Sequence, residues 1–394
     1  MVRIGELEIA GPVLVASGPP SRKVKFLKEA EANLAGAASL KLTFKTLPFP
    51  SELRTFSIPG VVMINPTDRR LVLDEAVELL RAAKKEVRMP LFANLGALGS
   101  DVKTWLELSE TFEAEGADGL ELNFCCPNLD VSFMEEGDYL KEHGGAQIGQ
   151  NPKQCHIITT KVKELVRIPV VPKFLPNALD VKAVARACED GGADGIHIVG
   201  MPVSGLPPVD VKSGRPEVAF TEGVSFGASN GPISKYSTFE TTARVRQAVE
   251  IPIVASGGIE NWRDAVTAIM WGASLVAVCS ALMWWGFEVV KDITEGIKDF
   301  MEEEGYSDWQ EFGGKALKYL TTPDKIRFCE GAARVDEELC IGCGKCLKPA
   351  HCDAITMRGE KAWVDEEKCV ACGICPGLCP VGAIRLISSG KALI

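Results

Sequence analysis

The sequence has few histidines, no excess of positive charge and no long apolar segment. Its formal net charge is −10, which argues against a nucleic-acid partner, because such proteins carry a basic surface. No run of about 18 apolar residues occurs, so we expect no membrane span. The first 20 residues carry Glu6 and Glu8 within their apolar stretch, unlike a signal peptide. We therefore expect a cytoplasmic protein.

Three further motifs are missing. No G-x-G-x-x-G follows an apolar run, so the chain is expected to have no dinucleotide-binding domain of its own. No C-x3-C-x2-C occurs before residue 310, which disfavours a radical-type barrel enzyme. The four histidines show no metal-ligand spacing. With 394 residues, of which 46% are hydrophobic, the chain is long enough for one large domain and one small domain.

Cysteine is abundant and unevenly placed. Of the 14 cysteines, eight lie in the last 55 residues. The segment VDEELCIGCGKC (335–346) recurs as VDEEKCVACGIC (364–375), and each copy contains C-x2-C-x2-C. Clustered cysteines at regular spacing in a long chain are typical of metal ligation in a reducing compartment.

The second copy continues to Cys379 and Pro380, which completes the run of a bacterial ferredoxin, whose fourth cysteine ligates the other cluster. The first copy reaches Cys352 after a five-residue gap and has Asp353 where proline is usual, which weakens the assignment of Cys352. A structural zinc pair is the alternative. We predict two [4Fe–4S] clusters, one held by Cys340, Cys343, Cys346 and Cys379, the other by Cys369, Cys372, Cys375 and Cys352.

The preceding 310 residues alternate short apolar runs with amphipathic helical stretches. This alternation favours a parallel sheet covered by helices, and eight units favour a (β/α)8 barrel, with a doubly wound sheet as the rival. We predict a barrel over 1–310, a linker over 311–330 and a small α+β ferredoxin domain over 331–394. The eight runs are 12–18, 38–44, 90–96, 119–126, 169–175, 195–200, 252–258 and 275–282.

Polar residues stand at the ends of these runs, where a barrel has its chemistry. They include Ser17, Lys41, Asn94, Asn123 and Lys173. Strand seven ends in Ser256, Gly257 and Gly258, and strand eight ends in Cys279 and Ser280. The last two strand ends of such barrels bind phosphate, because glycine lets backbone N–H groups approach the oxygens. Beside a ferredoxin domain, the phosphate is expected to belong to FMN.

The stretch ELNFCCPN (121–128) contains two adjacent thiols, Cys125 and Cys126. A disulfide between neighbours is strained, and a metal site usually needs a gap between its sulfurs. Either one thiol has a chemical role, or both are simply buried.

ELNFCCPN, together with GAQIGQNP, VPKFLPN, ASGGI and VCSAL, resembles the dihydroorotate dehydrogenase family, which commonly reads E-L-N-L-S-C-P at the first of these. The barrel followed by a ferredoxin repeat is similar to the iron–sulfur and FMN subunits of bacterial dihydropyrimidine dehydrogenases. The resemblance implies that Cys126 is the catalytic acid or base and that Cys125 takes the serine position. It implies substrate contacts by Asn65, Asn123, Phe124 and Cys125. It implies FMN contacts by Ala16, Ser17, Lys41, Leu42, Asn94, Lys173, Gly227, Ser256, Gly257, Gly258, Cys279 and Ser280.

The resemblance also implies an oxidoreductase that moves two hydrogens across a CH–CH or C=C bond beside a carbonyl. A thiol can give and take the proton, since its ordinary pKa lies near 8.5. The two clusters would relay the electrons to an FAD- and NAD(P)-binding subunit or to a ferredoxin. We expect an oligomer.

One stretch departs from the family. After strand six the pyrimidine enzymes carry an Asn-Thr pair, whereas this chain reads IVGMPVSG, with Gly200, Met201 and Pro202 near those positions. Lys212 and Arg215 follow in a long loop and could meet an anionic substrate or remain solvated. The substrate is therefore open: a pyrimidine, dihydroorotate or another cyclic enone or enoyl compound. A catalytically silent barrel in an electron-transfer subunit remains a further alternative.

Overall fold

The structure, a computed structural model, describes residues 1–47, 52–126, 144–175, 180–200, 203–218, 220–225, 227–328, 330–388 and 391–392. The chain divides into two compact units, Met1–Tyr319 and Leu320–Ile394. None of the helices in the ranges described combines the length and apolar character needed to cross a bilayer.

Eight parallel strands of the first unit close into a barrel, which confirms the predicted (β/α)8 fold and excludes the doubly wound sheet. Each strand pairs with the next along the chain, and the last pairs with the first through Val276 and Val13. The strands are β3 (Val13–Val15), β4 (Ala37–Ser39), β9 (Leu91–Leu95), β10 (Gly119–Asn123), β11 (Val170–Phe174), β12 (Ile196–Val199), β15 (Ile253–Ser256) and β16 (Leu275–Val278).

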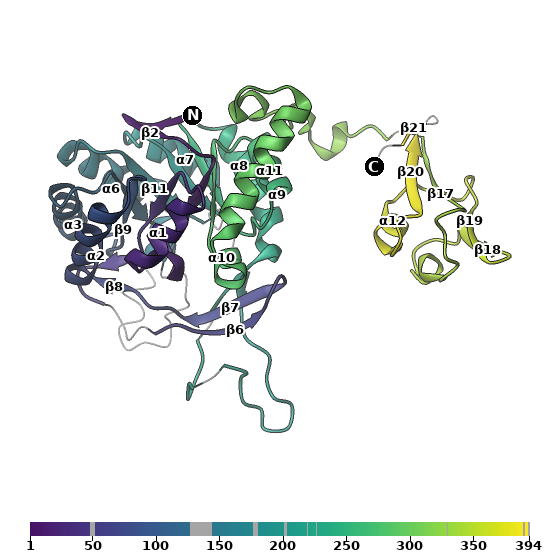
Figure 1. Cartoon of the computed structure of the whole chain (residues 1–394), viewed down its shortest axis with the longest axis horizontal. Helices are drawn as coiled ribbons and strands as arrows, with labels where there is room; N and C mark the ends of the chain where they lie inside the picture. The colour runs from purple at the N-terminus through teal and green to yellow at the C-terminus, as the bar shows by residue number, and fades with distance from the viewer. Residues whose placement is uncertain are drawn as a thin grey trace. The chain divides into compact units, whose positions relative to one another are not determined.

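Helices form the outer layer around these strands (Figure 1). Because helices cover them, the strands are buried on both faces and their sequences read as apolar runs. Several helices begin at a side chain that accepts a backbone N–H, as Asp101 does from Thr104. The helices are α1 (Val24–Ala32), α2 (Leu73–Glu86), α3 (Val102–Ala114), α5 (Gly145–Ile148), α6 (Pro152–Leu165), α7 (Val181–Asp190), α8 (Lys235–Arg246), α9 (Trp262–Met270), α10 (Ser280–Trp285) and α11 (Glu288–Glu304).

A four-stranded antiparallel sheet lies outside the barrel, and the sequence did not reveal it. It joins β6 (Arg54–Ile58) and β7 (Val62–Thr67), from the loop after the second barrel strand, to β13 (Val203–Gly205) and β14 (Gly227–Asn230), from the loop after the sixth. The central pairing aligns Asn65 with Ala228. Figure 1 shows β6 and β7 running across one end of the barrel. Two long loops are thereby tied together at the end where barrel active sites lie.

Short elements complete the first unit. They are the hairpin β1 (Val2–Ile4) and β2 (Leu7–Ile9), the strands β5 (Thr43–Phe44) and β8 (Leu71–Val72), and the 3-10 turns η1 (Pro19–Ser21), η2 (Pro232–Ser234), η3 (Trp309–Phe312) and η4 (Leu317–Tyr319). Phe312 is fully buried in the core of this unit.

The second unit is small and contains its own core around Ala333, Val364, Cys375 and Ile384. Strand β17 pairs antiparallel with β20, and β18 pairs antiparallel with β19. Its elements are η5 (Pro323–Lys325), β17 (Ala332–Val335), η6 (Lys345–Leu347), β18 (Ile355–Arg358), β19 (Lys361–Val364), α12 (Ile374–Leu378), β20 (Ile384–Ser388) and β21 (Lys391–Ala392).

Candidate active site

A cleft opens where the carboxyl ends of the barrel strands meet the antiparallel sheet. It contains about 770 Å³ of space, part of it open to solvent. The strand ends line it together with Met63 and Asn65 from β7 and Asn230 from β14. Eight of the predicted site residues lie in this lining: Ala16, Asn65, Lys173, Ser256, Gly257, Gly258, Cys279 and Ser280.

The turn after β15 exposes backbone to the cleft. Gly257 and Gly258 have φ angles of 108° and 76°, in the left-handed region that favours glycine. A Cβ atom on Gly258 would lie 2.4 Å from the backbone nitrogen of Lys235. The Thr238 hydroxyl lies 2.7 Å from the carbonyl oxygen of Gly257, to which it donates. Close packing thus holds this turn in place. Because its glycines have no side chains, the backbone N–H groups can approach a phosphate group.

The cleft also contains buried acceptors. Within the ranges described, Asn65 Oδ1 and Asp68 Oδ1 are buried and have no hydrogen-bond partner. Leaving a buried polar atom unpaired costs about 1–3 kcal/mol, so both positions favour a ligand with N–H or O–H donors. A flavin ring has such a donor between two carbonyl acceptors, which suits Asp68 Oδ1, and Lys173 supplies a cation. The lining therefore fits a flavin mononucleotide.

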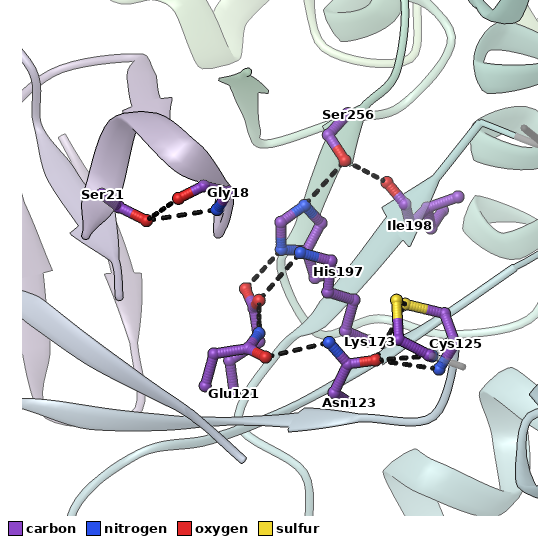
Figure 2. A network of polar contacts seen from close by, with 11 residues as sticks. Gly18, Ser21, Glu121, Asn123, Cys125, Lys173, His197, Ile198 and Ser256 are labelled. Carbon is purple, nitrogen blue, oxygen red and sulfur yellow. Dashed lines mark hydrogen bonds and ion pairs between the residues drawn. The ribbon is translucent and has the colours of Figure 1, made fainter. Parts of the chain in front are cut away.

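A buried network connects five barrel strands beneath this cleft (Figure 2). Glu121 on β10 accepts from Lys173 Nζ at 2.9 Å, from Asn94 Nδ2 and from His197 Nδ1. His197 Nε2 lies 2.9 Å from the Ser256 hydroxyl. The network connects the anionic centre at Glu121 to the turn that lines the cleft.

The partners of Glu121 decide its charge. Burial would raise the pKa of this carboxyl group, but the Lys173 ammonium and His197 outweigh burial and hold the pKa well below its usual range. Burial would likewise lower the pKa of Lys173, yet the Glu121 carboxylate reverses the shift and raises it. The pair is therefore ionised, and each charge is compensated by the other.

His197 is neutral, because burial lowers its pKa despite the adjacent carboxylate. A carboxylate only accepts hydrogen bonds, so Nδ1 carries the proton and donates it to Glu121. Nε2 is then an acceptor, which the Ser256 hydroxyl can satisfy. The histidine thus holds Ser256 in place at the start of the turn.

Asn123 organises the two adjacent thiols. Its Nδ2 donates to Asn94 Oδ1 at 2.9 Å, and its Oδ1 accepts the backbone N–H groups of Cys125 at 3.2 Å and Cys126 at 2.8 Å. The Cys125 sulfur also lies 3.0 Å from Asn123 Oδ1, which is an alternative acceptor for its single thiol proton. Because Nδ2 and Oδ1 of Asn123 both form hydrogen bonds within the protein, this side chain stabilises the turn that carries Cys126.

Cys126 is half-buried and Cys125 is buried, with their sulfurs 3.8 Å apart. The hydrogen bond from Cys125 lowers the pKa of Cys126 to about 6; burial opposes this shift, while the positive charges of Arg70, Lys173 and Lys41 reinforce it. The same contact, together with burial, raises the pKa of Cys125 well above its ordinary value. These surroundings therefore favour the thiolate form of Cys126 at neutral pH.

The thiols stand beside the cleft rather than in its lining. Cys126 and Val199 pack against the same small cluster of Cys125, Ala146 and Leu175, and Val199 lines the cleft. Phe124, expected near the substrate, instead packs in the core against Trp105, with ring centroids 5.5 Å apart.

Other predicted residues lie around the cleft. Lys41 is buried and pairs with Asp68, which lines the cleft. Gly227 packs against the backbone of Asn65, where a Cβ atom would lie 2.7 Å from its carbonyl oxygen. The lining does not include Ser17, Lys41, Leu42, Asn94 or Gly227. Met201 and Pro202 lie outside the described residues, and Lys212 and Arg215 are exposed.

Several residues of the site escaped the sequence analysis, namely Gly18, Met63, Asp68, Glu121, His197 and Asn230. Glu121 did leave a signal, because a carboxylate inside a buried apolar strand needs charged partners. Asn230 and Met63 left no signal in the sequence, since they reach the cleft only through the pairing of two distant loops.

In the second unit the cysteines gather as the duplication predicts. Burial raises the pKa of Cys346, and Cys340, Cys343 and Cys379 raise it further, so these four lie together. Burial likewise raises the pKa of Cys375, to about 11, with added contributions from Cys369 and Cys372.

Backbone geometry also suits cluster binding. Gly342, Gly344, Ala371 and Gly373 have left-handed φ angles of 69°, 66°, 51° and 82° and wrap the chain around the thiols. Backbone N–H groups of Ala333 and Ala383 donate to the sulfurs of Cys369 and Cys379, at 3.3 and 3.2 Å. Such bonds stabilise thiolates.

No group of three metal-binding side chains in the described part of the chain is close enough to hold a single ion. The binding of [4Fe–4S] clusters by these cysteines, with zinc as the alternative, stays a prediction at this point. Cys352 is exposed, and its ligand role remains a prediction.

Comparison with known proteins adds two domain matches. Residues 1–301 match the family described as dihydroorotate dehydrogenase, and residues 333–386 match the 4Fe-4S dicluster domain.

Three individual relatives show how similar the sequences are. The chain is 29% identical over 281 residues to the NAD-dependent dihydropyrimidine dehydrogenase subunit PreA of Escherichia coli (strain K12), covering 70% of this chain and 65% of that protein. It is 28% identical over 319 residues to the dihydroorotate dehydrogenase B (NAD(+)) catalytic subunit of Fusobacterium nucleatum, covering 80% of this chain and 98% of that protein. The corresponding subunit of Methanosarcina acetivorans is 32% identical over 235 residues, covering 60% of this chain and 69% of that protein.

Proposed function

Because the chain belongs to the dihydroorotate dehydrogenase family, we propose that it is an FMN- and iron–sulfur-dependent oxidoreductase acting on a CH–CH or C=C bond next to a carbonyl. The observation that carries this proposal is the position of Cys126, whose backbone N–H is held by Asn123 beside a cleft whose backbone turn suits a phosphate. A 4Fe-4S domain follows the barrel in the same chain.

FMN would be held by the turn of Ser256, Gly257 and Gly258, by Cys279 and Ser280, and by Lys173. When bound, the flavin supplies hydride chemistry at its ring. Lys173 places a positive charge that favours an anionic reduced ring. Its pairing with Glu121 keeps the ammonium charged despite burial. Ser256 is fixed by His197, so the start of the turn stays in place when the ligand leaves.

Cys126 is proposed to move the proton. A positioned acid or base contributes typically about 10²–10⁴-fold to the rate. As a thiolate at neutral pH, Cys126 is ready to remove a proton from a saturated substrate. In the reverse direction the protonated thiol would donate it.

The substrate is proposed to be a cyclic or conjugated carbonyl compound. Asn65 offers an unpaired buried oxygen to a ring N–H, which suits an amide such as that of a pyrimidine. At the end of β12, however, the lining contributes Val199 and Gly200, which have no side-chain hydrogen-bonding group. Each missing partner costs about 1–3 kcal/mol, so uracil and thymine are expected to bind at least tenfold more weakly than in an enzyme with the Asn-Thr pair.

Dihydroorotate is the second candidate substrate. The match to the Fusobacterium nucleatum subunit, which spans 98% of that protein, favours it. Turnover of dihydroorotate by the purified protein would decide for this candidate.

Electrons are proposed to pass through two clusters of the second unit to an FAD- and NAD(P)-binding subunit or a ferredoxin. The matched relatives are named as subunits, which supports a separate partner.

The proposal is tested by anaerobic purification followed by identification of the released flavin. Unsaturated carbonyl compounds, including uracil, thymine and orotate, are then screened for oxidation of the reduced flavin. We expect FMN and re-oxidation by at least one compound. Absence of any flavin would overturn the proposal, and flavin that no compound re-oxidises would favour a catalytically silent barrel.

A further inference from the structure

Cys125 has no assigned chemistry in the proposed reaction, yet its sulfur lies 3.8 Å from that of Cys126. The two thiols differ in environment, since Cys125 is buried at 3% exposure whereas Cys126 is half-buried. Cys126 is therefore the more accessible residue of the pair, and the Cys125 sulfur lies directly beside its own.

We propose that Cys125 and Cys126 form a peroxide-reactive dithiol, in which a hydroperoxide oxidises Cys126 and Cys125 converts the product to a reversible disulfide between the two neighbours. This role lies beyond the proposed function, which needs only the proton on Cys126.

The environment of Cys126 makes it the first thiol to react. The thiolate is the nucleophile toward peroxides, and Cys126 ionises more readily than any ordinary cysteine, with a pKa of about 6. Lys41 and Lys173 contribute positive charge to this site. Redox-sensitive cysteines are typically accessible, low in pKa and placed next to a resolving thiol, and Cys126 meets all three conditions.

The steps balance without a further reactant. The Cys126 thiolate attacks the terminal oxygen of the hydroperoxide, forms an S–O bond and breaks the O–O bond, leaving a sulfenic acid. The alkoxide released, or hydroxide in the case of hydrogen peroxide, takes up the proton that Cys126 gave to solvent when it ionised. The Cys125 sulfur then attacks the Cys126 sulfur, and the sulfenic hydroxyl leaves with the Cys125 proton as water. Overall, two thiols lose two electrons and two protons, and the hydroperoxide is reduced to water and an alcohol, or to two waters when it is hydrogen peroxide.

The backbone geometry at Cys125 and Cys126 also explains why the disulfide between them would be easily reduced. Bridged cysteines normally have Cα atoms about 4.4–6.8 Å apart, whereas neighbours joined by a trans peptide are about 3.8 Å apart. The backbone cannot readily relax, because Gly145 packs so closely that a Cβ atom there would lie 2.1 Å from the carbonyl oxygen of Cys126. A strained disulfide is more easily reduced, so a dithiol reductant should restore both thiols.

Cys155 and Cys188 provide an internal comparison. They also lie next to each other, but both are fully buried, and burial raises the pKa of Cys188 well above its ordinary value. Cys188 is therefore protonated at neutral pH, and neither thiol is exposed to solvent, so the same peroxide dose should leave this pair reduced.

The test uses the full-length protein, prepared anaerobically with its clusters and treated with one equivalent of hydrogen peroxide. After blocking of free thiols, one tryptic peptide, residues 104–141, carries Cys125 and Cys126 and no other cysteine. We expect this peptide to lose two hydrogen atoms and to resist alkylation. Dithiothreitol should restore both thiols to full alkylation. Activity is not the readout, so a failed proposal about catalysis would not affect the outcome.

Two variants test the roles of the two thiols separately. In Cys125→Ser, Cys126 should instead accumulate as sulfenic acid, trapped by dimedone, and then as sulfinic acid that dithiothreitol does not reverse. In Cys126→Ser, Cys125 should remain a thiol. Irreversible oxidation of Cys126 in the wild type at the rate seen in Cys125→Ser would overturn the proposal. If a variant fails to fold, the wild-type peptide alone decides, because absence of the two-hydrogen loss contradicts the proposal.

Discussion

At the scale of single residues, the site depends on a buried carboxylate with three donors. Glu121 binds Lys173, His197 and Asn94, which come from three other barrel strands. The sequence indicated Lys173 and Asn94 by their places at strand ends. It did not indicate Glu121 or His197, because a strand pattern shows which residues are buried but not which buried polar groups meet.

Glu121→Gln should destabilise the barrel strongly. The change leaves the Lys173 ammonium buried without its carboxylate, and breaking one side of a buried pair costs about 3–5 kcal/mol. Thermal unfolding followed by circular dichroism would measure the loss. The control is Glu115→Gln, which breaks the exposed pair with Arg81 and should leave stability nearly unchanged. Equal effects of the two changes would contradict the assigned role of Glu121.

Cys125→Ala should raise the pKa of Cys126. The hydrogen bond from Cys125 is the largest cause of the low value, so its removal favours the protonated thiol. The rate of iodoacetamide modification of Cys126, followed against pH, reports this pKa directly. In the wild type the rate should reach half its plateau near pH 6, and in the variant the midpoint should move to higher pH. An unchanged midpoint would show that the cations alone set the pKa.

At the scale of elements, the sequence predicted all eight barrel strands, because a strand covered on both faces must be apolar along its length. It did not predict the antiparallel sheet. That sheet pairs residues 62–67 with 227–230, and such long-range pairing leaves no local periodicity to read. The sequence therefore did not predict that Met63 and Asn230 line the cleft. Asn65, by contrast, was predicted from the family resemblance.

Gly258→Ala should disrupt the turn after β15. A non-glycine residue at positive φ costs about 1–3 kcal/mol, and the added Cβ would also collide with the backbone of Lys235. Gly214→Ala is the matched control, since Gly214 has a φ of 71° but open space around its Cβ position. We expect only Gly258→Ala to lose bound flavin, measured as the flavin-to-protein ratio after gel filtration. Equal retention in both variants would remove this turn from the binding site.

At the scale of the whole molecule, the chain combines a barrel of the dihydroorotate dehydrogenase family with a 4Fe-4S domain. The duplicated cysteine pattern predicted this second unit from spacing alone, because ligand spacing is fixed by the cluster. Sequence spacing could not show which thiols lie close together. Cys346 has Cys379 among its neighbours, but it is also a neighbour of Cys375, so the exchange of Cys379 between repeats stays a prediction.

Cys379→Ser should damage the cluster of the first repeat, although Cys379 belongs to the second. Electron paramagnetic resonance of the reduced protein should show the same remaining signal in Cys379→Ser and Cys346→Ser. Cys375→Ser should leave the other signal. If Cys379→Ser instead matches Cys375→Ser, each repeat binds its own cluster and the predicted exchange is wrong.

The most direct test of the whole account is a single turnover with Cys126→Ala. The reduced flavin of wild type and variant is mixed anaerobically with the unsaturated compound found by screening, and flavin re-oxidation is followed. Cys188→Ala, which removes a buried thiol far along the chain, serves as control. We predict that Cys126→Ala retains its flavin but is re-oxidised about 10²–10⁴-fold more slowly, while the control matches the wild type. Re-oxidation of Cys126→Ala at the wild-type rate would contradict the claim that this thiol moves the proton.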